Sequence, residues 1–257
     1  MSINQSVCLP ILGNFNQKTL IKEIAEIGYS AVEIWGRDEK FEELCDHTQE
    51  YGLTIASMIG HESLTDGLNN PNNHHRIEDE LGKSIEIAVK SGISGLICFS
   101  GNRIAGLTES QALENTAKGL LRVAPYAERC GITLNIELLN SKIDHIGYQC
   151  DSTGWGLEII KQVNSPNVKL LYDIYHMQIM EGDIIRTISE NINAIGHFHT
   201  AGNPGRNELD DNQELNYSAI CSTIAATDYK GFVGHEFRPR GDNIVGALKQ
   251  AFITCSG

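Results

Sequence analysis

The chain has 257 residues, of which 41% are hydrophobic, so it carries enough apolar material for the core of one large domain. Its 20 lysines and arginines are outnumbered by 33 aspartates and glutamates, which gives a formal net charge of -13. A polyanion such as DNA would be repelled by this charge unless a local basic patch compensated it. The densest basic segment, residues 238–240, holds two arginines around a proline. We therefore expect no nucleic-acid partner.

Seven cysteines are scattered along the chain, and no two of them form a C-x-x-C pair. This spacing is typical of reduced thiols and does not indicate a zinc or redox site. The first ten residues lack a positively charged segment followed by an apolar one, and nowhere do about 18 apolar residues run together. These features predict a cytoplasmic protein that is neither secreted nor inserted into a membrane.

Eight short apolar runs recur along the chain, and each is followed by a stretch with helical periodicity. The predicted strands are Val7–Ile11, Ala31–Trp35, Leu53–Ile59, Gly95–Phe99, Thr133–Leu138, Val168–Ile174, Ile195–His199 and Gly231–Phe237. Successive strands begin roughly 20 to 40 residues apart, which is the length that a crossover helix needs to return the chain to a parallel neighbour.

This alternation favours an α/β fold, a single (β/α)8 TIM barrel domain over residues 1–257. Several helical segments end in glycine just before a strand, as at Gly28, Gly92 and Gly131, which is typical of a left-handed helix terminus. An open, doubly wound sheet is the alternative. That fold usually has a glycine-rich phosphate turn after its first strand, whereas residues 12–15 read LGNF here.

Ionisable residues stand at the ends of four successive predicted strands, and catalytic groups of such barrels come from the carboxyl ends of strands. These residues are Glu137, Asp173 with His176, His197 with His199, and His235 with Glu236. They lie in otherwise apolar sequence, where an unpaired charge would cost several kcal/mol. A divalent cation compensates such charges, although a hydrogen-bonded core group is the alternative for any one residue. We predict that one divalent metal binds Glu137, Asp173, His199 and Glu236.

Strand periodicity selects the ligand among neighbouring residues. His197 and His199 share a face, and we choose His199 because it lies nearer the catalytic rim. We expect His197 to lie in an interior layer of the barrel below the site, and His235 to pack on the opposite side from Glu236. Carboxylate-rich ligation favours Mg or Mn, and one histidine also admits Co, Zn or Fe(II).

Four segments of the second half of the chain resemble a known family. They are LYDIYHMQIMEGD (Leu171–Asp183), NPGRNE (Asn203–Glu208), ELNY (Glu214–Tyr217) and GFVGHEFRPRGD (Gly231–Asp242). They resemble the hydroxypyruvate isomerase family, within the xylose isomerase-like barrels that include ketose 3-epimerases. The resemblance is specific from Glu137 to Asp242 and mainly architectural over residues 1–130.

The resemblance implies a metal-dependent conversion of hydroxypyruvate to tartronate semialdehyde by proton transfer through an enediolate. Glu137 and Glu236 would be metal ligands and also the catalytic acid/base pair, while His176 and Arg206 would hold a small hydroxycarbonyl or sugar substrate. The chain departs from the family at His199, where typical members have glutamine and ketose epimerases have histidine. It also has Asn207 where histidine is usual. A ketose 3-epimerase is therefore an alternative activity.

Further residues are weaker candidates for the pocket. His61 follows the third strand and is expected to line the pocket, and Glu33 to hydrogen-bond a pocket group or a substrate hydroxyl. For Arg206 the alternative is a salt bridge to Glu208 or Asp210. Arg238 and Arg240 are second candidates for contact with a substrate anion.

Two interpretations of another class remain open. An abasic-site DNA endonuclease shares this type of barrel, but the charge of -13 argues against it. A barrel that binds a sugar without converting it is the other interpretation, and the presence of both glutamates argues against that one. The sequence leaves the oligomeric state open, a homo-oligomer included.

Overall fold

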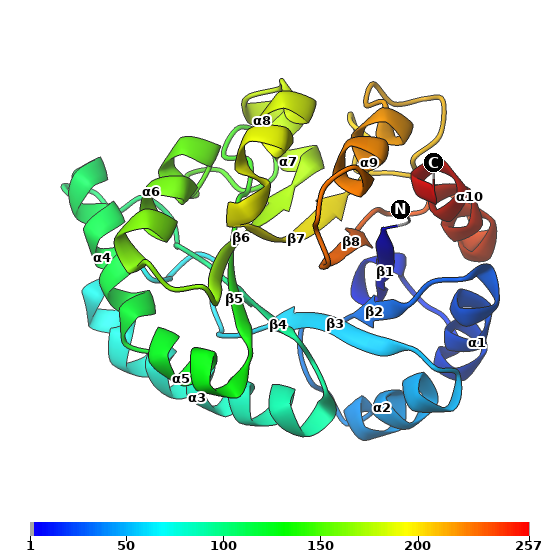
Figure 1. Ribbon diagram of the computed structural model, residues 1–257, viewed down its shortest axis with the longest axis horizontal. Coiled ribbons are helices and arrows are strands. Elements are labelled where there is room, and N and C mark those ends of the chain that lie inside the picture. The colour runs from blue at the N-terminus through cyan, green and yellow to red at the C-terminus, as the bar shows by residue number, and fades with distance from the viewer. Residues whose placement is uncertain (1–2, 257) are drawn as a thin grey trace. The chain divides into compact units, whose positions relative to one another are not determined.

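A computed structural model describes residues 3–256 of the chain. Its eight strands run in the order β1-β2-β3-β4-β5-β6-β7-β8 and close into a barrel, which confirms the predicted fold class (Figure 1). The strands are Asn4–Cys8 (β1), Ala31–Glu33 (β2), Thr54–Ile59 (β3), Gly95–Cys98 (β4), Thr133–Glu137 (β5), Val168–Asp173 (β6), Ile195–Thr200 (β7) and Phe232–His235 (β8).

Helices alternate with the strands along the described chain. They are Gln17–Ile27 (α1), Phe41–Glu50 (α2), His74–Ser91 (α3), Glu109–Leu121 (α4), Ala124–Cys130 (α5), Thr153–Val163 (α6), Ile174–Met180 (α7), Ile184–Asn191 (α8), Tyr217–Ala225 (α9) and Ile244–Ser256 (α10). Short 3-10 turns cover Leu9–Leu12, Pro71–Asn73 and Ile192–Ala194. Within residues 3–256, no helix combines the length and the apolar character that crossing a membrane requires.

The first strand lies three residues earlier than predicted. It covers Asn4–Cys8, not Val7–Ile11, and the apolar residues that follow form a 3-10 turn. Pro10 explains the difference, because proline has no backbone N–H to donate to a strand ladder. The other strands begin or end within two residues of the predicted positions.

The chain divides into two compact units. The first comprises the residues up to Met58, Asp183–Asn193 and the chain from Phe198 onward; the second comprises Ile59–Gly182 and Ala194–His197. The prediction of one domain over residues 1–257 stays a prediction.

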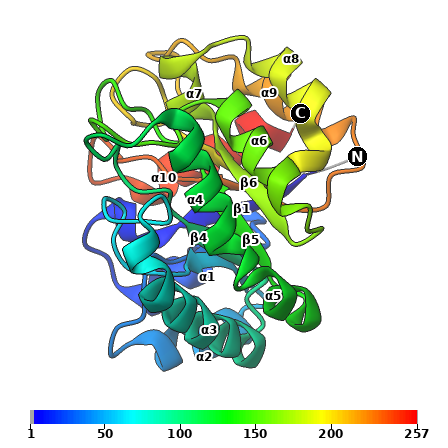
Figure 2. The ribbon, with the colours of Figure 1, turned by 90° about the vertical axis from the view of Figure 1, so that its left-hand side faces the viewer.

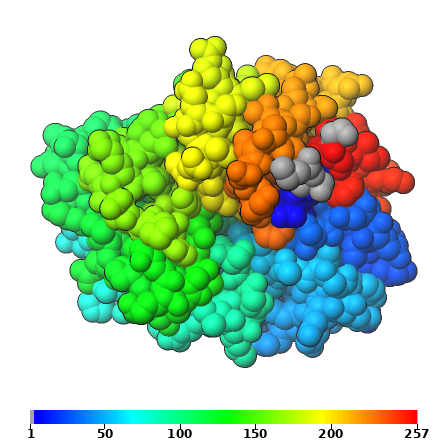
Figure 3. Space-filling model, in the orientation of Figure 1, coloured from blue at the N-terminus to red at the C-terminus, as the bar shows by residue number. Residues whose placement is uncertain are grey.

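In the first unit, helices α1 and α10 pack against each other, as do α9 and α10 (Figures 1 and 3). Helix α1 is amphipathic and buries Leu20, Ile21 and Ile24. After this helix ends, the hydroxyl of Tyr29 donates to the carbonyl of Leu248 at 2.8 Å and so ties α1 to α10. Burying such apolar side chains stabilises the unit by about 1.5 to 3 kcal/mol per residue.

In the second unit, helix α4 packs against α6 and α3 (Figure 2). Helix α4 begins with a capping box, in which Thr108 and Gln111 each bind the backbone N–H of the other. Helix α3 buries Ile77, Leu81 and Ile85 on one face, at the spacing of an amphipathic helix.

Strand register brings particular side chains to the same level of the sheet. Ser6 of β1 is paired with Ala31 of β2 and with Gly234 of β8. Glu33 of β2 is paired with Ser57 of β3, after a register shift between Val32 and Glu33. Such irregularities re-aim a side chain, and this one directs Glu33 toward Ser57.

Candidate functional site

The predicted ligands lie at the carboxyl ends of their strands. Glu137 and Asp173 are the last residues of β5 and β6, His199 is the penultimate residue of β7, and Glu236 directly follows β8. None of these four side chains is more than 6% exposed.

The donor atoms of these residues form one group. One carboxylate oxygen each from Glu137, Asp173 and Glu236 and one ring nitrogen of His199 lie within 4.8 Å of one another. Buried carboxylates at such separations repel one another, because the low permittivity of the interior strengthens their interaction. A divalent cation offsets this repulsion, and a set of three carboxylates and one imidazole suits Mg or Mn and also admits Co, Zn or Fe(II). The donor set therefore fits one divalent metal ion.

Glu236 has different neighbours at its two carboxylate oxygens. Oε1 accepts hydrogen bonds from Nε1 of Trp35 at 3.1 Å and from Sγ of Cys8 at 3.6 Å. Oε2 lies 3.4 Å from Nδ1 of His199 and forms an ion pair with the guanidinium of Arg206. Burial and then the nearby carboxylate of Glu236 raise the pKa of the Cys8 thiol well above its usual value. Cys8 therefore acts here as a neutral donor.

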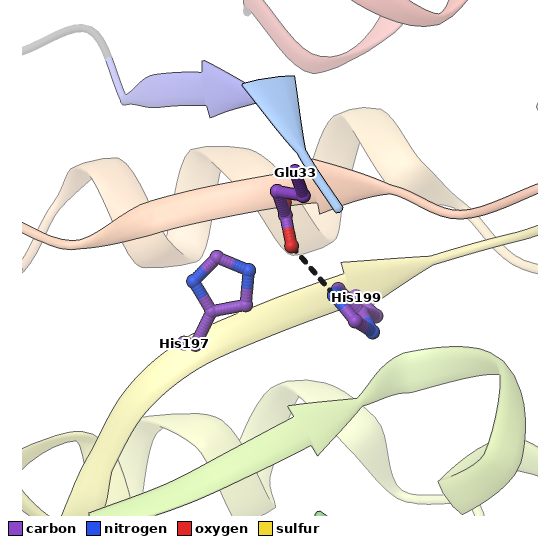
Figure 4. A group of neighbouring side chains, drawn as sticks. All are labelled: Glu33, His197 and His199. Carbon is purple, nitrogen blue, oxygen red and sulfur yellow. Dashed lines mark hydrogen bonds and ion pairs between the residues drawn. The ribbon is translucent and has the colours of Figure 1, made fainter. Parts of the chain in front are cut away.

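The other ring nitrogen of His199 contacts Glu33. Nε2 lies 3.0 Å from Oε2 of Glu33 (Figure 4). A carboxylate only accepts hydrogen bonds, so Nε2 carries the proton in this contact. Glu33 was expected to hydrogen-bond a group of the pocket, and the group that it contacts is the ring of His199.

His176 and Asp173 are joined at the start of α7. The Asp173 side chain caps this helix by accepting from the backbone N–H of His176 at 3.0 Å. Nδ1 of the His176 ring lies 2.5 Å from the side-chain Nδ2 of Asn140, which donates, so the ring proton is on Nε2. Nε2 lies 3.6 Å from Oδ2 of Asp173. A contact between His176 and substrate stays a prediction.

Arg206 adopts the left-handed conformation with φ of 56°, which is uncommon for a residue other than glycine. Its guanidinium pairs with Glu236, whereas the sequence offered Glu208 and Asp210 as alternative partners. Those two acids pair instead with Arg240.

Arg240, Glu208 and Asp210 form an ion-pair cluster that includes none of the predicted ligands. The hydrogen bond from Arg240 holds the pKa of the Asp210 carboxyl at about 2. Arg240 is thereby engaged, and Arg238 is exposed. Contact of either residue with a substrate anion stays a prediction.

His61 is braced by the backbone on both sides of its ring. Nδ1 lies 3.0 Å from the carbonyl of Glu62, and Nε2 accepts from the backbone N–H of Phe99 at 2.9 Å. Burial lowers the pKa of His61 to about 4. Both ring nitrogens contact the backbone, and a role of His61 in substrate binding stays a prediction.

His235 packs on the side away from Glu236, as expected. Its Nδ1 lies 2.7 Å from the hydroxyl of Thr200 and its Nε2 lies 2.9 Å from Oε1 of Gln5. The ring also meets Tyr29 edge-on, with centroids 5.6 Å apart. This residue fills the layer between β8 and the helices of the first unit.

Comparison with known proteins assigns the fold to a family. A model described as a xylose isomerase-like TIM barrel matches residues 21–252. The chain belongs to the xylose isomerase-like TIM barrel family.

Within this family, the chain is similar to the hydroxypyruvate isomerase of Escherichia coli K12, with 32% identity over 170 residues, which are 66% of this chain and 65% of that protein. A solved structure titled AP endonuclease, family 2, from Brucella melitensis has a TM-score of 0.83 and 25% identity, covering 96% of each chain. That of D-allulose 3-epimerase from Methylomonas sp. in complex with D-allulose has a TM-score of 0.81 and 21% identity, covering 100% of this chain and 98% of that one, and it supports the fold alone.

The sequence analysis missed four residues that contact Glu33 or Glu236. Ser6 and Ser57 hydrogen-bond Glu33, while Trp35 and Cys8 hydrogen-bond Glu236. The available signal was the two-residue alternation of strands, which places Ser6 with Cys8 and Glu33 with Trp35 on common faces.

Acid should destabilise the protein partly through His61. Because its folded-state pKa of about 4 lies below the ordinary value of 6.5, the unfolded chain binds a proton first as the pH falls. The stabilising contribution is complete above pH 6.5 and is lost between 6.5 and 4. In urea unfolding between pH 7 and 5, His61→Gln should show a shallower pH dependence than the wild type, by at most about 1.4 kcal/mol per pH unit. Equal slopes would contradict this account.

Proposed function

We propose that this protein is a divalent-metal-dependent isomerase of a small hydroxycarbonyl compound, of the hydroxypyruvate isomerase type. Moving a carbonyl along such a compound requires removing a weakly acidic C–H proton and stabilising the enediolate that forms. The observation that carries the proposal is the group formed by Glu137, Asp173, His199 and Glu236, whose donor atoms lie within 4.8 Å of one another. The similarity to the E. coli hydroxypyruvate isomerase supports the same class of reaction.

The bound ion would act as a Lewis acid that stabilises the negative charge developing on the substrate oxygens. The chain must supply the groups that move the proton, and we assign this task to Glu137 and Glu236. A carboxylate takes a proton from one carbon and a carboxylic acid returns it to the neighbouring one. Asp173 and His199 complete the metal shell without exchanging protons with substrate.

The surroundings of Glu236 suit a proton-transfer group. Trp35 and Cys8 hold Oε1 through neutral donors, so that oxygen has a fixed position. Oε2 is the oxygen that faces Nδ1 of His199 and the guanidinium of Arg206. In its ionised form this carboxyl can accept a proton, and Oε2 lies against the guanidinium of Arg206.

Arg206 is our candidate for binding a substrate anion. Its planar guanidinium can bind a carboxylate through two parallel hydrogen bonds, and hydroxypyruvate carries such a carboxylate. The side chain is only 12% exposed, so it would meet substrate in a largely dry pocket, where the charge pair is strong. We assign His176 to a substrate oxygen, with Nε2 as the donor.

Ketose 3-epimerisation is the second candidate, because His199 stands where hydroxypyruvate isomerases typically have glutamine. The same two glutamates would then take a proton from one face of a carbon and return it to the other. An abasic-site endonuclease is disfavoured by the charge of -13, and a barrel that only binds sugar leaves the two glutamates unexplained. A cytoplasmic location and a homo-oligomeric state stay predictions.

Glu236→Gln should abolish turnover while leaving the fold intact, because the amide keeps the shape of the side chain and cannot accept the proton. Wild-type protein loaded with Mn should convert hydroxypyruvate or a ketose in D2O and leave deuterium on carbon, whereas the variant should lose at least about 10²-fold of that exchange. Glu158→Gln, a change of the same kind at a half-buried position on α6 that pairs with Lys161, is the control. Wild-type exchange in Glu236→Gln would remove the proposed proton shuttle.

Arg206→Lys should raise KM for hydroxypyruvate by about tenfold or more, since lysine keeps the charge but loses the bidentate geometry. KM for a neutral ketose should change less. Arg240→Lys is the matched control, because Arg240 pairs with Asp210 and Glu208 outside the group of predicted ligands. Steady-state kinetics of the two variants with both substrates provide the measurement. An equal change for the anionic and the neutral substrate would contradict a carboxylate-binding role.

A further inference from the structure

Glu33 is a buried carboxylate that the proposed reaction does not use. Its side chain is 1% exposed and lies at the end of β2, in the same unit as His199. Oε1 accepts from the hydroxyl of Ser6 at 2.5 Å, and Oε2 accepts from the hydroxyl of Ser57 at 2.6 Å and from His199 at 3.0 Å. A charge at such a position would be costly without these donors. The three hydrogen bonds fix the carboxylate in one orientation.

Strand β8 leaves space for the side chains of Glu33 and His199 at Gly234. Gly234 of β8 is the register partner of both Ser6 and His199. A Cβ atom at this position would lie 2.0 Å from Oε1 of Glu33 and 3.1 Å from Cδ2 of His199. Any other residue at Gly234 would therefore displace the carboxylate or the ring. The close approach is a second observation, independent of the hydrogen bonds, that the fold is built around the contact of Glu33 with His199.

We propose that Glu33 is a positioning residue, which accepts the Nε2 proton of His199 and so keeps the Nδ1 lone pair available as the metal donor. Nδ1 is the nitrogen that lies 3.4 Å from Oε2 of Glu236, which is another predicted ligand. A carboxylate behind a ligating histidine fixes its tautomer and its ring plane and makes the donor nitrogen more basic. The inference rests on the proposed function, because that function is what makes His199 a metal ligand.

A second metal ion is the competing role for Glu33. Glu33, His197 and His199 also offer donor atoms within 4.8 Å of one another (Figure 4). In that arrangement Glu33 would be a ligand, and Nε2 of His199 would have to lose its proton. The two roles differ in the number of ions bound and in the position of the ring proton.

The ring proton can be located without metal. Long-range proton–nitrogen correlation spectra of metal-free, 15N-labelled protein, with His199→Gln to assign the signals, report which nitrogen of His199 is protonated. We expect a proton on Nε2, the nitrogen that contacts Glu33. An Nε2 that carries no proton in the wild type would overturn the proposal.

Calorimetric titration with Mn²⁺ tests the consequence for binding. Glu33→Gln should weaken Mn²⁺ binding by about 10- to 100-fold, because a neutral amide is a weaker acceptor than a carboxylate. Ser57→Ala removes one of the hydrogen bonds to Glu33 and should weaken binding by a smaller factor. Glu50→Gln is the matched control: this exposed glutamate pairs with Lys18, and its replacement should leave the affinity unchanged.

The outcomes separate this inference from the proposed function. Absence of Mn²⁺ binding by the wild type would refute the proposed metal dependence and with it this role for Glu33. Normal binding by the wild type with an unchanged affinity in Glu33→Gln would refute the positioning role alone. Two ions in the wild type and one in Glu33→Gln would make Glu33 a ligand and also overturn it. If Glu33→Gln does not fold, Ser57→Ala and the ring-proton measurement still decide.

Discussion

Carboxylates withdrawn from water at the ends of strands are the constraint on which the rest of this structure depends. Each must meet hydrogen-bond donors or a cation, because burying an uncompensated charge costs several kcal/mol. Glu33 is hydrogen-bonded to the hydroxyls of Ser6 and Ser57 and to the imidazole of His199. Glu236 accepts hydrogen bonds from the indole of Trp35 and the thiol of Cys8, and it pairs with the guanidinium of Arg206. The group of Glu137, Asp173, His199 and Glu236 concentrates three such charges, and a divalent ion is the compensation that its chemistry favours.

The fold could be predicted from the sequence, and the four residues that we propose as ligands were selected from it, for two physical reasons. Strands and helices that alternate at crossover length admit few architectures, and the absence of a glycine-rich first turn favoured the closed barrel. An acid or histidine in an apolar strand is conspicuous because it must be compensated, as Asp173 within LLYDIYH illustrates. The two-residue period of strands puts His197 and His199 on one face, and the position nearer the rim favours His199 as the proposed ligand.

Other features of the site depend on which strands adjoin and at what register, and one sequence carries no direct record of that. The bond from Ser57 to Glu33 follows from a register shift at Val32 and Glu33. The pairing of Arg206 with Glu236 was missed because the two residues are 30 positions apart in the chain. His61 looked available at a strand end, but backbone groups of Glu62 and Phe99 occupy its ring nitrogens.

The central claim is that one divalent ion binds at the four strand-end residues. Anomalous diffraction from crystals of the protein saturated with Mn²⁺ tests it most directly. The account predicts a single strong peak within about 2.3 Å of Nδ1 of His199 and of carboxylate oxygens from Glu137, Asp173 and Glu236. A peak bound elsewhere, or bound through Nε2 of His199, would contradict it.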